Sequence, residues 1–402
     1  MKHIQCIGCL LLLFTLAIVP QMAQADAPGF LGQPGSAQQD ATVHGHDIVL
    51  PGISGDWGGT RASLEDRGVR IESAYIGEFV RDFSGGTPSG NNVVYQDNLD
   101  LTMTLDSKKL GLWRGGTLFI YGLRNHGGDP SANIIGDLQT ASNIEAPDQF
   151  IVHEAWYEQQ FADGLLSILI GLHDLNSEFY VSDYGSLFIN SSFGIGPDMS
   201  ANVPVSLFPK AGLGARLRVA PSDHTYLQAA IYDGDPATRS LHAAEGKLMI
   251  GEAGFNSETG SYKLGYWNHT ADITVGPRTY SNDYGLYGVI DQELMHFDGD
   301  SAIAAFFQYG WAPAARNTVT RYIGGGLHLH GLIPTRDEDD IGIAIARADT
   351  HLNAESTLEL TYRLVLTPWL AIQPSYQVIQ NPGGDGTVPT AHVGLLRFEV
   401  AL

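Results

Sequence analysis

Polar and apolar residues alternate along most of the chain beyond residue 69, in short segments separated by clusters of Gly, Pro, Asn and Asp. A period of two places successive side chains on opposite faces of a β-strand, and the separating residues favour turns. The pattern predicts an all-β chain. Sixteen segments follow it: Val69–Phe83, Val93–Asp106, Gly116–Asn125, Phe150–Phe161, Leu165–Asp174, Ala211–Ala220, Thr225–Asp233, Lys247–Asn256, Gly260–Thr270, Asp283–Gln292, Ser301–Gly310, Arg321–Ile333, Asp340–Arg347, Glu355–Leu366, Leu370–Gln380 and His392–Leu402.

The two faces of these segments differ in chemistry. In the second segment Leu99 and Leu101 share one face, while Asp100 and Thr102 share the other. One apolar face and one polar face, repeated along the chain, are typical of a transmembrane β-barrel with lipid outside and water inside. A soluble β-sandwich or β-helix is the alternative fold, but it leaves the repeated opposition of faces unexplained.

An antiparallel up-and-down barrel of about 16 strands is therefore the predicted fold. The even number of segments fits a bacterial barrel whose two chain ends both face the periplasm. The longest apolar run beyond the N-terminal leader, Leu165–Leu172, is much shorter than the ~18 residues that a membrane-spanning helix needs. The sequence thus predicts spanning strands and no spanning helix.

The N-terminal part departs from the alternation. Residues 1–25 combine a basic start, an apolar stretch and the small-residue ending Ala23-Gln24-Ala25, which predicts a secretory signal peptide. One short helix is expected over Ala62–Gly68, with Thr60 as its N-cap. We expect a signal peptide at 1–25, a flexible arm at 26–54 and the barrel domain with its short helix at 55–402.

The composition narrows the function further. Charged residues make up 16% of the chain against a typical ~25%, and the formal net charge is −22, which disfavours nucleic acid as a partner. Both cysteines lie in the leader, so a disulfide scaffold or a cysteine-ligated zinc is excluded. His44-Gly45-His46-Asp47 and the pair His328 and His330 lack a positioned third ligand, so we expect neither a metal nor another cofactor.

Two connections are much longer than the others, Gly127–Gln149 and Leu175–Lys210. Long connections in compact domains are usually functional or disordered. The second is rich in residues that are normally buried: Phe179, Tyr180, Tyr184, Leu187, Phe188, Ile189 and Phe193. We therefore expect it to fold into the lumen of the barrel and to narrow the pore.

Short motifs along the chain carry a family resemblance. They include Gly55-Asp56-Trp57-Gly58-Gly59-Thr60-Arg61, His153-Glu154-Ala155-Trp156-Tyr157-Glu158-Gln159, Gly171-Leu172-His173-Asp174-Leu175-Asn176-Ser177-Glu178-Phe179, Gly251-Glu252-Ala253-Gly254 and Glu355-Ser356-Thr357-Leu358-Glu359-Leu360-Thr361-Tyr362. In their order and spacing the chain resembles the carbohydrate-selective porins of the OprB type. These are outer-membrane barrels that admit glucose and related sugars.

The resemblance implies passive, sugar-selective diffusion across the outer membrane of a Gram-negative bacterium, without catalysis or cofactor. It implies neutral mono- or oligosaccharides or polyols as substrates, with outer-membrane lipid and the barrel-assembly machinery as partners, and it leaves a homo-oligomer open. Two departures concern His173, where a basic residue is commoner, and Leu402, where an aromatic residue often ends the barrel.

The alternation also selects residues for a sugar path. A sugar has hydroxyl groups at its edges and C–H groups on its faces, so charged hydrogen-bonding groups and aromatic rings suit it. The residues expected on the inner face or at the constriction are Arg124, Glu154, Trp156, Glu158, Asp174, Asn176, Glu178, Phe179, Arg216, Arg218, Glu359 and Arg363. An error of one residue in the alternation would turn such a side chain outward.

Two alternative functions stay open at this point. The acidic balance supports a general or cation-preferring porin. A barrel that serves only as the scaffold of a glycan-binding protein or enzyme is the other alternative. A glycosidase built on Glu154 and Glu158 is disfavoured, because residues four apart on a strand lie about 13 Å apart, beyond both spacings that glycosidases use.

Overall fold

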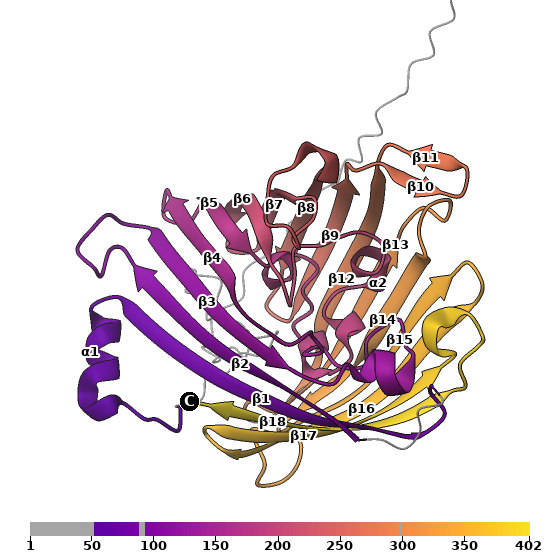
Figure 1. Ribbon diagram of the computed structural model, residues 1–402. Helices are drawn as coiled ribbons and strands as arrows, with labels where there is room; N and C mark the ends of the chain where they lie inside the picture. Colours follow the sequence, from indigo (N-terminus) through magenta and orange to yellow (C-terminus); the bar gives the residue numbers. More distant parts are fainter. Residues whose placement is uncertain (1–51, 88–92, 298) are drawn as a thin grey trace, which may run out of the picture. The chain divides into compact units, whose positions relative to one another are not determined.

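Sixteen antiparallel strands close into a barrel in the computed structural model, which describes residues 52–87, 93–297 and 299–402 (Figure 1). Each barrel strand pairs with its neighbours in chain order, and the first strand pairs with the last. The predicted fold and strand number are confirmed. The strands are β1 (Val69–Ser84), β2 (Val93–Asp106), β3 (Gly116–His126), β4 (Gln149–Phe161), β5 (Leu166–His173), β6 (Gly212–Ser222), β7 (Thr225–Asp233), β8 (Lys247–Asn256), β9 (Gly260–His269), β12 (Asp283–His296), β13 (Ala302–Trp311), β14 (Val319–His330), β15 (Asp340–Thr350), β16 (Ala354–Thr367), β17 (Leu370–Gln380) and β18 (Ala391–Ala401).

Burial alternates along the strands as the sequence predicts. Leu101 is 54% exposed and Leu360 53%, whereas their strand neighbours Asp100 and Glu359 are completely buried. The apolar residues therefore cover the outside of the barrel, and the polar residues line its inside. Among the residues that the structure describes, every helix is too short or too polar to span a bilayer.

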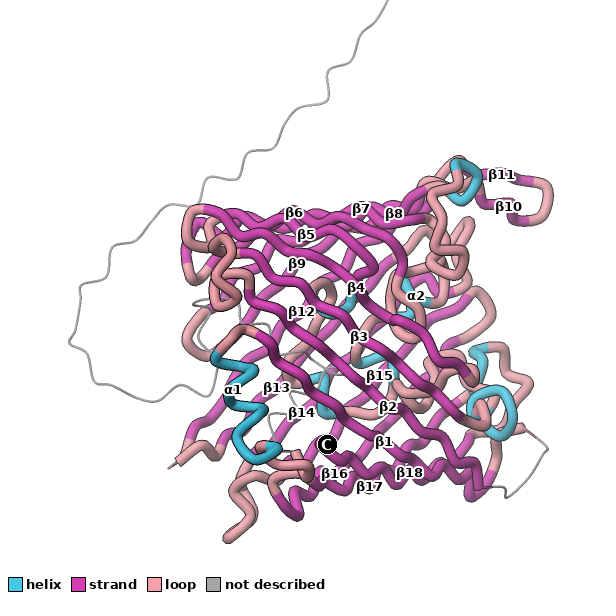
Figure 2. The backbone as a smooth tube through the Cα atoms, turned by 60° about the vertical axis from the view of Figure 1, so that its left-hand side comes forward, coloured by secondary structure: helices cyan, strands magenta, loops and turns pink. Residues whose placement is uncertain are grey.

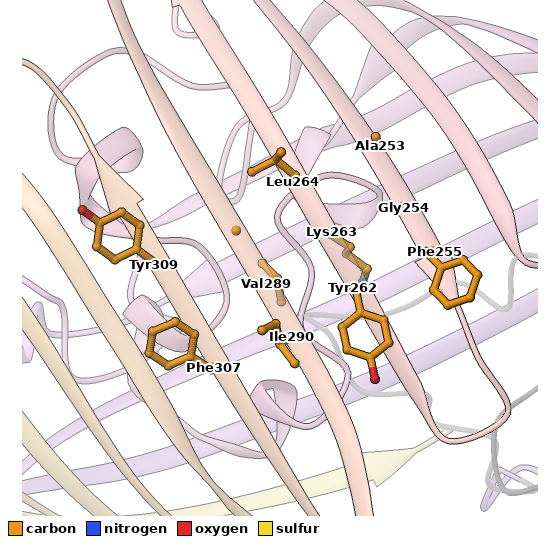
Figure 3. A pocket seen from close by; sticks show the side chains of 11 residues that line it. Ala253, Gly254, Phe255, Tyr262, Lys263, Leu264, Val289, Ile290, Phe307 and Tyr309 are labelled. Atoms are coloured by element: carbon orange, nitrogen blue, oxygen red, sulfur yellow. The ribbon is translucent and has the colours of Figure 1, made fainter. Parts of the chain in front are cut away.

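The outer surface over β8, β9, β12 and β13 illustrates this division. Large apolar side chains surround a shallow pocket there, and Ala253 and Gly288 contribute to its lining (Figure 3). The ridges around the pocket are formed by Phe255, Tyr262, Leu264, Ile290, Phe307 and Tyr309. Lys263 lies between two of these residues in the sequence, and its ammonium group donates to the carbonyl oxygen of Val181, in the loop after β5, at 2.7 Å.

The connections differ in length at the two ends of the barrel (Figure 2). Tight turns join β4 to β5, β6 to β7 and β8 to β9, whereas the opposite end carries the long loops 127–148, 174–211 and 270–282. The loop 270–282 contains a small hairpin, which the sequence did not predict. The remaining elements are β10 (Ile273–Val275), β11 (Arg278–Tyr280), α2 (Pro197–Ser200) and single helical turns at Trp57–Gly59, Ser131–Ile135, Leu175–Ser177, Gly185–Leu187, Ser191–Phe193, Ala243–Glu245 and Pro382–Gly384.

The short helix α1 (Thr60–Asp66) precedes β1, two residues earlier than expected, and Thr60 is its first residue instead of its cap. The Arg61 guanidinium donates to the carbonyl oxygen of Leu402 at 3.1 Å, just after the end of β18. A Cβ on Gly52 would lie 2.2 Å from the same oxygen, so this approach requires a glycine. The predicted signal peptide 1–25, most of the arm 26–54 and the motif His44-Gly45-His46-Asp47 lie outside the described residues.

Candidate functional site: the constricted lumen

The inner wall of the barrel contains a β-bulge on β4. Tyr121 of β3 pairs with Glu154, and the register then skips His153. Both His153 and Glu154 are consequently buried on the inner face, and the alternation reverses upstream, where Phe150 is 81% exposed. The bulge thus brings two successive polar side chains into the lumen, close to the start of the loop 174–211.

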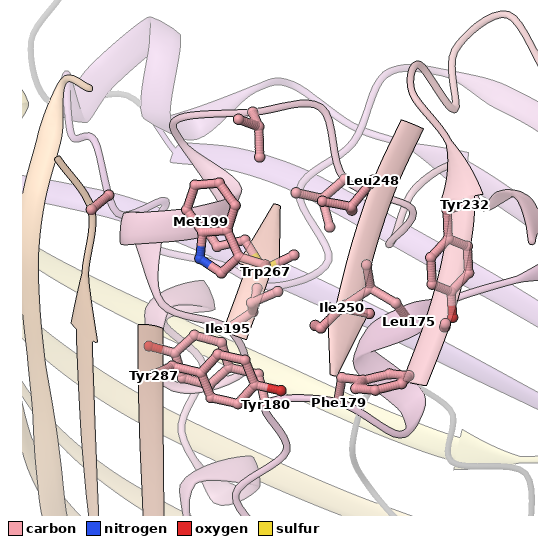
Figure 4. Packing of buried hydrophobic residues seen from close by; sticks show 14 of the residues in the cluster. Leu175, Phe179, Tyr180, Ile195, Met199, Tyr232, Leu248, Ile250, Trp267 and Tyr287 are labelled. Atoms are coloured by element: carbon pink, nitrogen blue, oxygen red, sulfur yellow. The ribbon is translucent and has the colours of Figure 1, made fainter. Parts of the chain in front are cut away.

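The loop 174–211 packs against this inner wall, as the sequence predicts. Tyr180 of the loop stacks on Tyr287 of β12, with ring centroids 4.1 Å apart and planes inclined by 10°. The buried cluster around this pair joins Leu175, Phe179, Ile195, Met199, Val203 and Val205 of the loop to Ala230, Tyr232, Leu248, Ile250, Trp267 and Val289 of the wall (Figure 4). Apolar burial on this scale keeps the loop inside the barrel.

Arg216 on β6 fastens the beginning of the loop. Its guanidinium donates to both carboxylate oxygens of Glu178 at 2.6 Å, to Glu158 at 2.8 Å and to the hydroxyl of Ser167. Burial opposes the ionisation of Glu178, but the adjacent Arg216 guanidinium outweighs burial and lowers the pKa of this carboxyl to about 2. Arg216, 2% exposed, is therefore the centre of a buried ion cluster.

Asp174 and Asn176 shape the loop itself. One carboxylate oxygen of Asp174 accepts the backbone N–H of Asn176 at 2.8 Å, and the other accepts that of Phe208 at 2.8 Å. The side-chain amide of Asn176 donates to the carbonyl oxygens of Phe179 and Gly194, both at 3.1 Å. The two residues thus tie the beginning of the loop to its middle and its end.

Glu154 and Trp156 point inward, as predicted, but they are part of the wall. Glu154 accepts the backbone N–H of Asp174 at 2.9 Å and the indole N–H of Trp156 at 3.1 Å. The Trp156 ring stacks on Phe119 with centroids 5.0 Å apart, and the residue is only 7% exposed. The structure therefore gives this ring no open face toward the lumen.

Glu359 holds the loop from the opposite wall. Its carboxylate on β16 accepts the backbone N–H groups of Ile189 at 2.8 Å and Asn190 at 3.0 Å, and the hydroxyl of Ser375 at 2.9 Å. The residue is completely buried. Its carboxylate oxygens accept hydrogen bonds from the protein itself and not from a solute, so Glu359 anchors the loop.

Two of the predicted arginines are half-buried on the inner face. Arg363 on β16 donates to Glu399 at 3.0 Å and lies 3.8 Å from a carboxylate oxygen of Asp340. Arg218 on β6 lies with its guanidinium carbon 4.2 Å from the ring centroid of Tyr226. Arg363 thus lies beside two carboxylates, whereas the hydrogen bond of Arg218 is a long one, to Gln228 at 3.5 Å.

The assignment of Arg124 to the lumen was wrong. Its side chain is 49% exposed and lies 3.5 Å from Asp97, whereas its strand neighbours Leu123 and Asn125 are buried on the inner face. Odd-numbered residues of β3 face inward, so Arg124 faces outward by the same alternation that places the others. Its position before a long loop was no guide to its orientation.

The loop 127–148 also enters the lumen, which the sequence did not predict. The backbone N–H of Asn143 donates to Ile189 at 2.8 Å, and that of Ser191 donates to Thr140 at 3.0 Å. The two long loops therefore meet. Apolar residues of this loop, Ile134, Ile135 and Ala141, pack on Val80, Ile379, Ala391, Val393 and Leu395 of the wall.

Carboxyl groups hold this second loop. Glu355 on β16 accepts the backbone N–H groups of Leu138 at 2.7 Å, Gln139 at 2.8 Å and Gly383 at 2.7 Å. The adjacent carboxylate of Asp137 is shielded from solvent, and within the described ranges neither of its oxygens has a hydrogen-bond partner. Burial, together with the nearby Glu355 carboxylate, raises the pKa of Asp137 to about 8.

Two residues of the constriction were missed by the sequence reasoning. Arg397 on β18 donates to Glu78 at 2.9 Å and to the side-chain oxygen of Asn143 at 2.7 Å, so it fastens the loop 127–148. In the last segment the residues on either side of Arg397 face outward, so the alternation already indicated that Arg397 faces inward. His153 lies within 3.3 Å of Asp174, but only the bulge brings it there, and the sequence does not reveal a bulge.

His328 and His330 face the lumen on β14, each with a ring nitrogen 2.8 Å from the same oxygen of Asp340. Among residues 52–87, 93–297 and 299–402, no group of three or more His, Cys, Asp or Glu side chains is arranged to hold a metal ion. The two histidines therefore share Asp340 as their hydrogen-bond partner.

The family model described as "Carbohydrate-selective porin, OprB family" matches residues 91–402. The chain belongs to this family. Porin B of Pseudomonas aeruginosa is 25% identical to it over 92% of this chain and 96% of that protein. The OprB fold is also shared with the high-pH structure of Pseudomonas putida OprB, with a TM-score of 0.81 at 22% identity over 88% of this chain and 99% of that one. For the low-pH structure the TM-score is 0.60 at 21% identity, over 88% and 98%.

Membership of the OprB family explains the features described above. The protein is an outer-membrane porin of the carbohydrate-selective kind, a channel rather than an enzyme.

Proposed function

We propose that this OprB-family porin lets neutral monosaccharides such as glucose diffuse passively through a water-filled lumen narrowed by the loops 174–211 and 127–148. The observation that carries the proposal is the buried cluster of Arg216, Glu178 and Glu158, because it fixes the first loop in place. A fixed, polar-walled passage selects solutes by size and by hydrogen bonding, and it needs no energy source or cofactor.

We propose two roles for the predicted site residues. Glu154, Trp156, Glu158, Asp174, Asn176, Glu178, Phe179, Arg216 and Glu359 act on the sugar indirectly, since they set the shape and position of the constriction loop. Arg218 and Arg363 are half-buried on the inner face and are the residues of the set that we place along the sugar path.

We propose that the protein has no catalytic activity. Glu154 accepts the backbone N–H of Asp174, and Glu158 accepts from Arg216 and Ser167. A pair of carboxylates that is committed to such contacts is not available as the acid and base of a glycosidase.

We propose the remaining organisation from the sequence: a signal peptide at 1–25, an arm at 26–54 and the barrel domain at 55–402. The barrel is inserted by the barrel-assembly machinery and contacts outer-membrane lipid through its apolar surface. The mass of the purified protein in detergent tests whether copies of the chain assemble into a homo-oligomer.

Single-channel recording in a planar bilayer tests the proposed function. We expect steady conductance that falls when glucose is added, because a bound sugar obstructs the ions. Conductance that glucose does not change would instead favour a general porin, and a reversal potential set by cations alone would favour the cation-preferring alternative. Correctly folded protein without conductance would identify the barrel as a scaffold.

A further inference from the structure

Aromatic rings on the inner face of the barrel offer no free surface. Those of the strands are all 7% exposed or less: Phe119, Tyr121, Trp156, Tyr226, Tyr232, Trp267, Tyr287, Phe306 and Tyr322. In the constriction loop, Phe179, Tyr180, Tyr184, Phe188 and Phe193 are 5% exposed or less. Phe208, near the end of the same loop, is half-buried. The other rings are too covered to stack on the face of a sugar, so hydrogen-bonding groups carry most of the recognition.

Most charged groups of the constriction are already committed to partners inside the protein. Arg218 on the wall and Asp183 at the tip of the loop differ from them. Arg218 is half-buried and makes a single long hydrogen bond, from one guanidinium nitrogen to Gln228 at 3.5 Å, although a guanidinium carries five N–H donors. Asp183 is exposed, and in the described part of the chain its carboxylate accepts no hydrogen bond.

Both side chains project from rigid supports. Arg218 lies over Tyr226, whose hydroxyl donates to Glu252 at 2.8 Å. The Tyr226 ring lies flat across Gly254, where a Cβ would come within 2.1 Å of it. A side chain at position 254 would therefore displace the ring that supports the guanidinium.

The backbone of Asp183 is held from two sides. Its N–H donates to the carboxylate of Asp291 on β12 at 3.2 Å, and its carbonyl oxygen accepts the hydroxyl of Ser186 at 2.6 Å. The Glu252 carboxylate on β8 accepts both the Tyr226 hydroxyl at 2.8 Å and the backbone N–H of Tyr180 at 3.0 Å. Because Lys263 also donates to Val181 at 2.7 Å, the loop segment that carries Asp183 lies against the part of the wall that carries Arg218. They form no ion pair with each other in the part of the chain that is described, so neither side chain occupies the hydrogen-bonding groups of the other.

We propose that Asp183 and Arg218 form a two-sided hydroxyl-binding subsite at the constriction. The Asp183 carboxylate accepts a hydrogen bond from one hydroxyl of a sugar, while the Arg218 guanidinium donates to a neighbouring hydroxyl. An acceptor and a donor on opposite sides suit the vicinal hydroxyl groups of a neutral sugar, which both donate and accept. The inference rests on the proposed sugar passage and names the residues that give it specificity.

Asp183→Asn and Arg218→Gln test the subsite, with Asp223→Asn in the exposed turn after β6 as the matched control. The readouts are the glucose concentration that halves single-channel conductance and the reversal potential in a salt gradient. Each subsite variant should require about three- to tenfold more glucose than the parent, which is the size expected when a charged hydrogen bond is lost in a wet pore. Asp183→Asn should shift ion preference toward anions and Arg218→Gln toward cations.

The outcomes separate the subsite from the proposed function. If glucose does not block the parent channel, the proposed function fails. If glucose blocks the parent and both subsite variants equally, the subsite is wrong while the function stands. If Asp223→Asn weakens the block as much as Asp183→Asn does, the effect comes from net charge and the subsite is also wrong. A folded barrel, shown by heat-modifiable migration in electrophoresis, is required of every variant.

Discussion

Both loops that narrow the lumen are held by an arginine paired with a carboxylate and by a carboxylate that accepts backbone N–H groups, but the charges that meet at one anchor of each loop differ. The loop 174–211 is held by an arginine between two carboxylates and by a large aromatic cluster. The loop 127–148 is held by Glu355, which accepts backbone N–H groups, beside the shielded carboxyl of Asp137. The first anchor brings opposite charges together, whereas the second brings together two groups of the same charge.

This difference predicts different responses to pH and to mutation. A carboxylate that is buried against a guanidinium stays ionised over the whole physiological range, as Glu178 does with its pKa lowered to about 2. Two neighbouring carboxyl groups keep a proton until the pH is high. Similar positions inside one lumen therefore do not imply similar behaviour.

The largest expected effect is that of shortening the first loop. Deleting residues 182–198 removes the aromatic tip that fills the lumen, so single-channel conductance should rise and glucose block should weaken. A deletion of 274–279 in the hairpin of the loop 270–282 serves as the control and should leave both unchanged. A folded 182–198 deletion with the parent's conductance would mean that this loop does not set the narrowest cross-section.

Arg216→Ala should be the most damaging single substitution at the constriction. It leaves Glu158 and Glu178 buried without their cation, and breaking a buried pair in this way costs about 3–5 kcal/mol. The double variant Arg216→Ala with Glu178→Ala should recover part of the loss, since one unpaired charge is removed with its partner. Urea unfolding in detergent measures both, and equal losses in the two variants would contradict the ion cluster as the anchor.

The second loop should loosen at alkaline pH. The pKa of Asp137 is raised from its usual ~3.9 to about 8, so the docked loop binds this proton more tightly than the free loop does. The docking free energy from this group is complete below about pH 4 and is lost as the pH rises through about 8. Hydrogen-exchange protection of the Leu138 and Gln139 amides should therefore fall between pH 6 and 9.

Asp137→Asn provides the control for this pH effect, because an amide cannot ionise. Protection of the same two amides should become independent of pH in this variant, apart from intrinsic exchange. In the parent, the amide of Glu178, whose own pKa is lowered to about 2, should keep its protection over the same range. A fall at Leu138 and Gln139 that persists in Asp137→Asn would show that Asp137 is not the responsible group.

The smallest effect is expected for Glu359→Gln. The amide retains one oxygen for the backbone N–H groups of Ile189 and Asn190, but its NH2 group faces the other donor. An unmade buried hydrogen bond costs about 1–3 kcal/mol, so the loop should stay in the lumen with modestly lower stability. Thermal unfolding compared with Glu338→Gln, in the turn between β14 and β15, isolates this cost. A Glu359→Gln protein as stable as that control would remove Glu359 from the anchor.

Strand number, strand positions and most side-chain orientations were predictable, because the period of two depends only on the alternation of residues. Glu154, Trp156 and Arg216 face inward for this reason. What the alternation could not give is the partner of each inward group. Trp156 is covered by Phe119, and Glu359 is occupied by a loop about 170 residues away, contacts that depend on how the loop folds back.

Two other failures have local causes. The bulge at His153 has no marker in the residues around it, so it was invisible in the sequence. The loop 127–148 carries no Phe, Trp or Tyr, and its docking depends on backbone N–H groups that any sequence offers to Glu355. Interactions made by the backbone leave little trace in the amino-acid pattern.

The contact between Arg61 and Leu402 has a consequence for the order of folding. The two residues are 341 positions apart in the chain, and the first and last barrel strands are separated by a similar distance. Joining such distant segments costs more loop-closure entropy than pairing neighbouring hairpins, so neighbouring strands form first. The hydrogen bond from Arg61 to Leu402 therefore belongs to the last stage of assembly, and its formation marks a ring that has already closed.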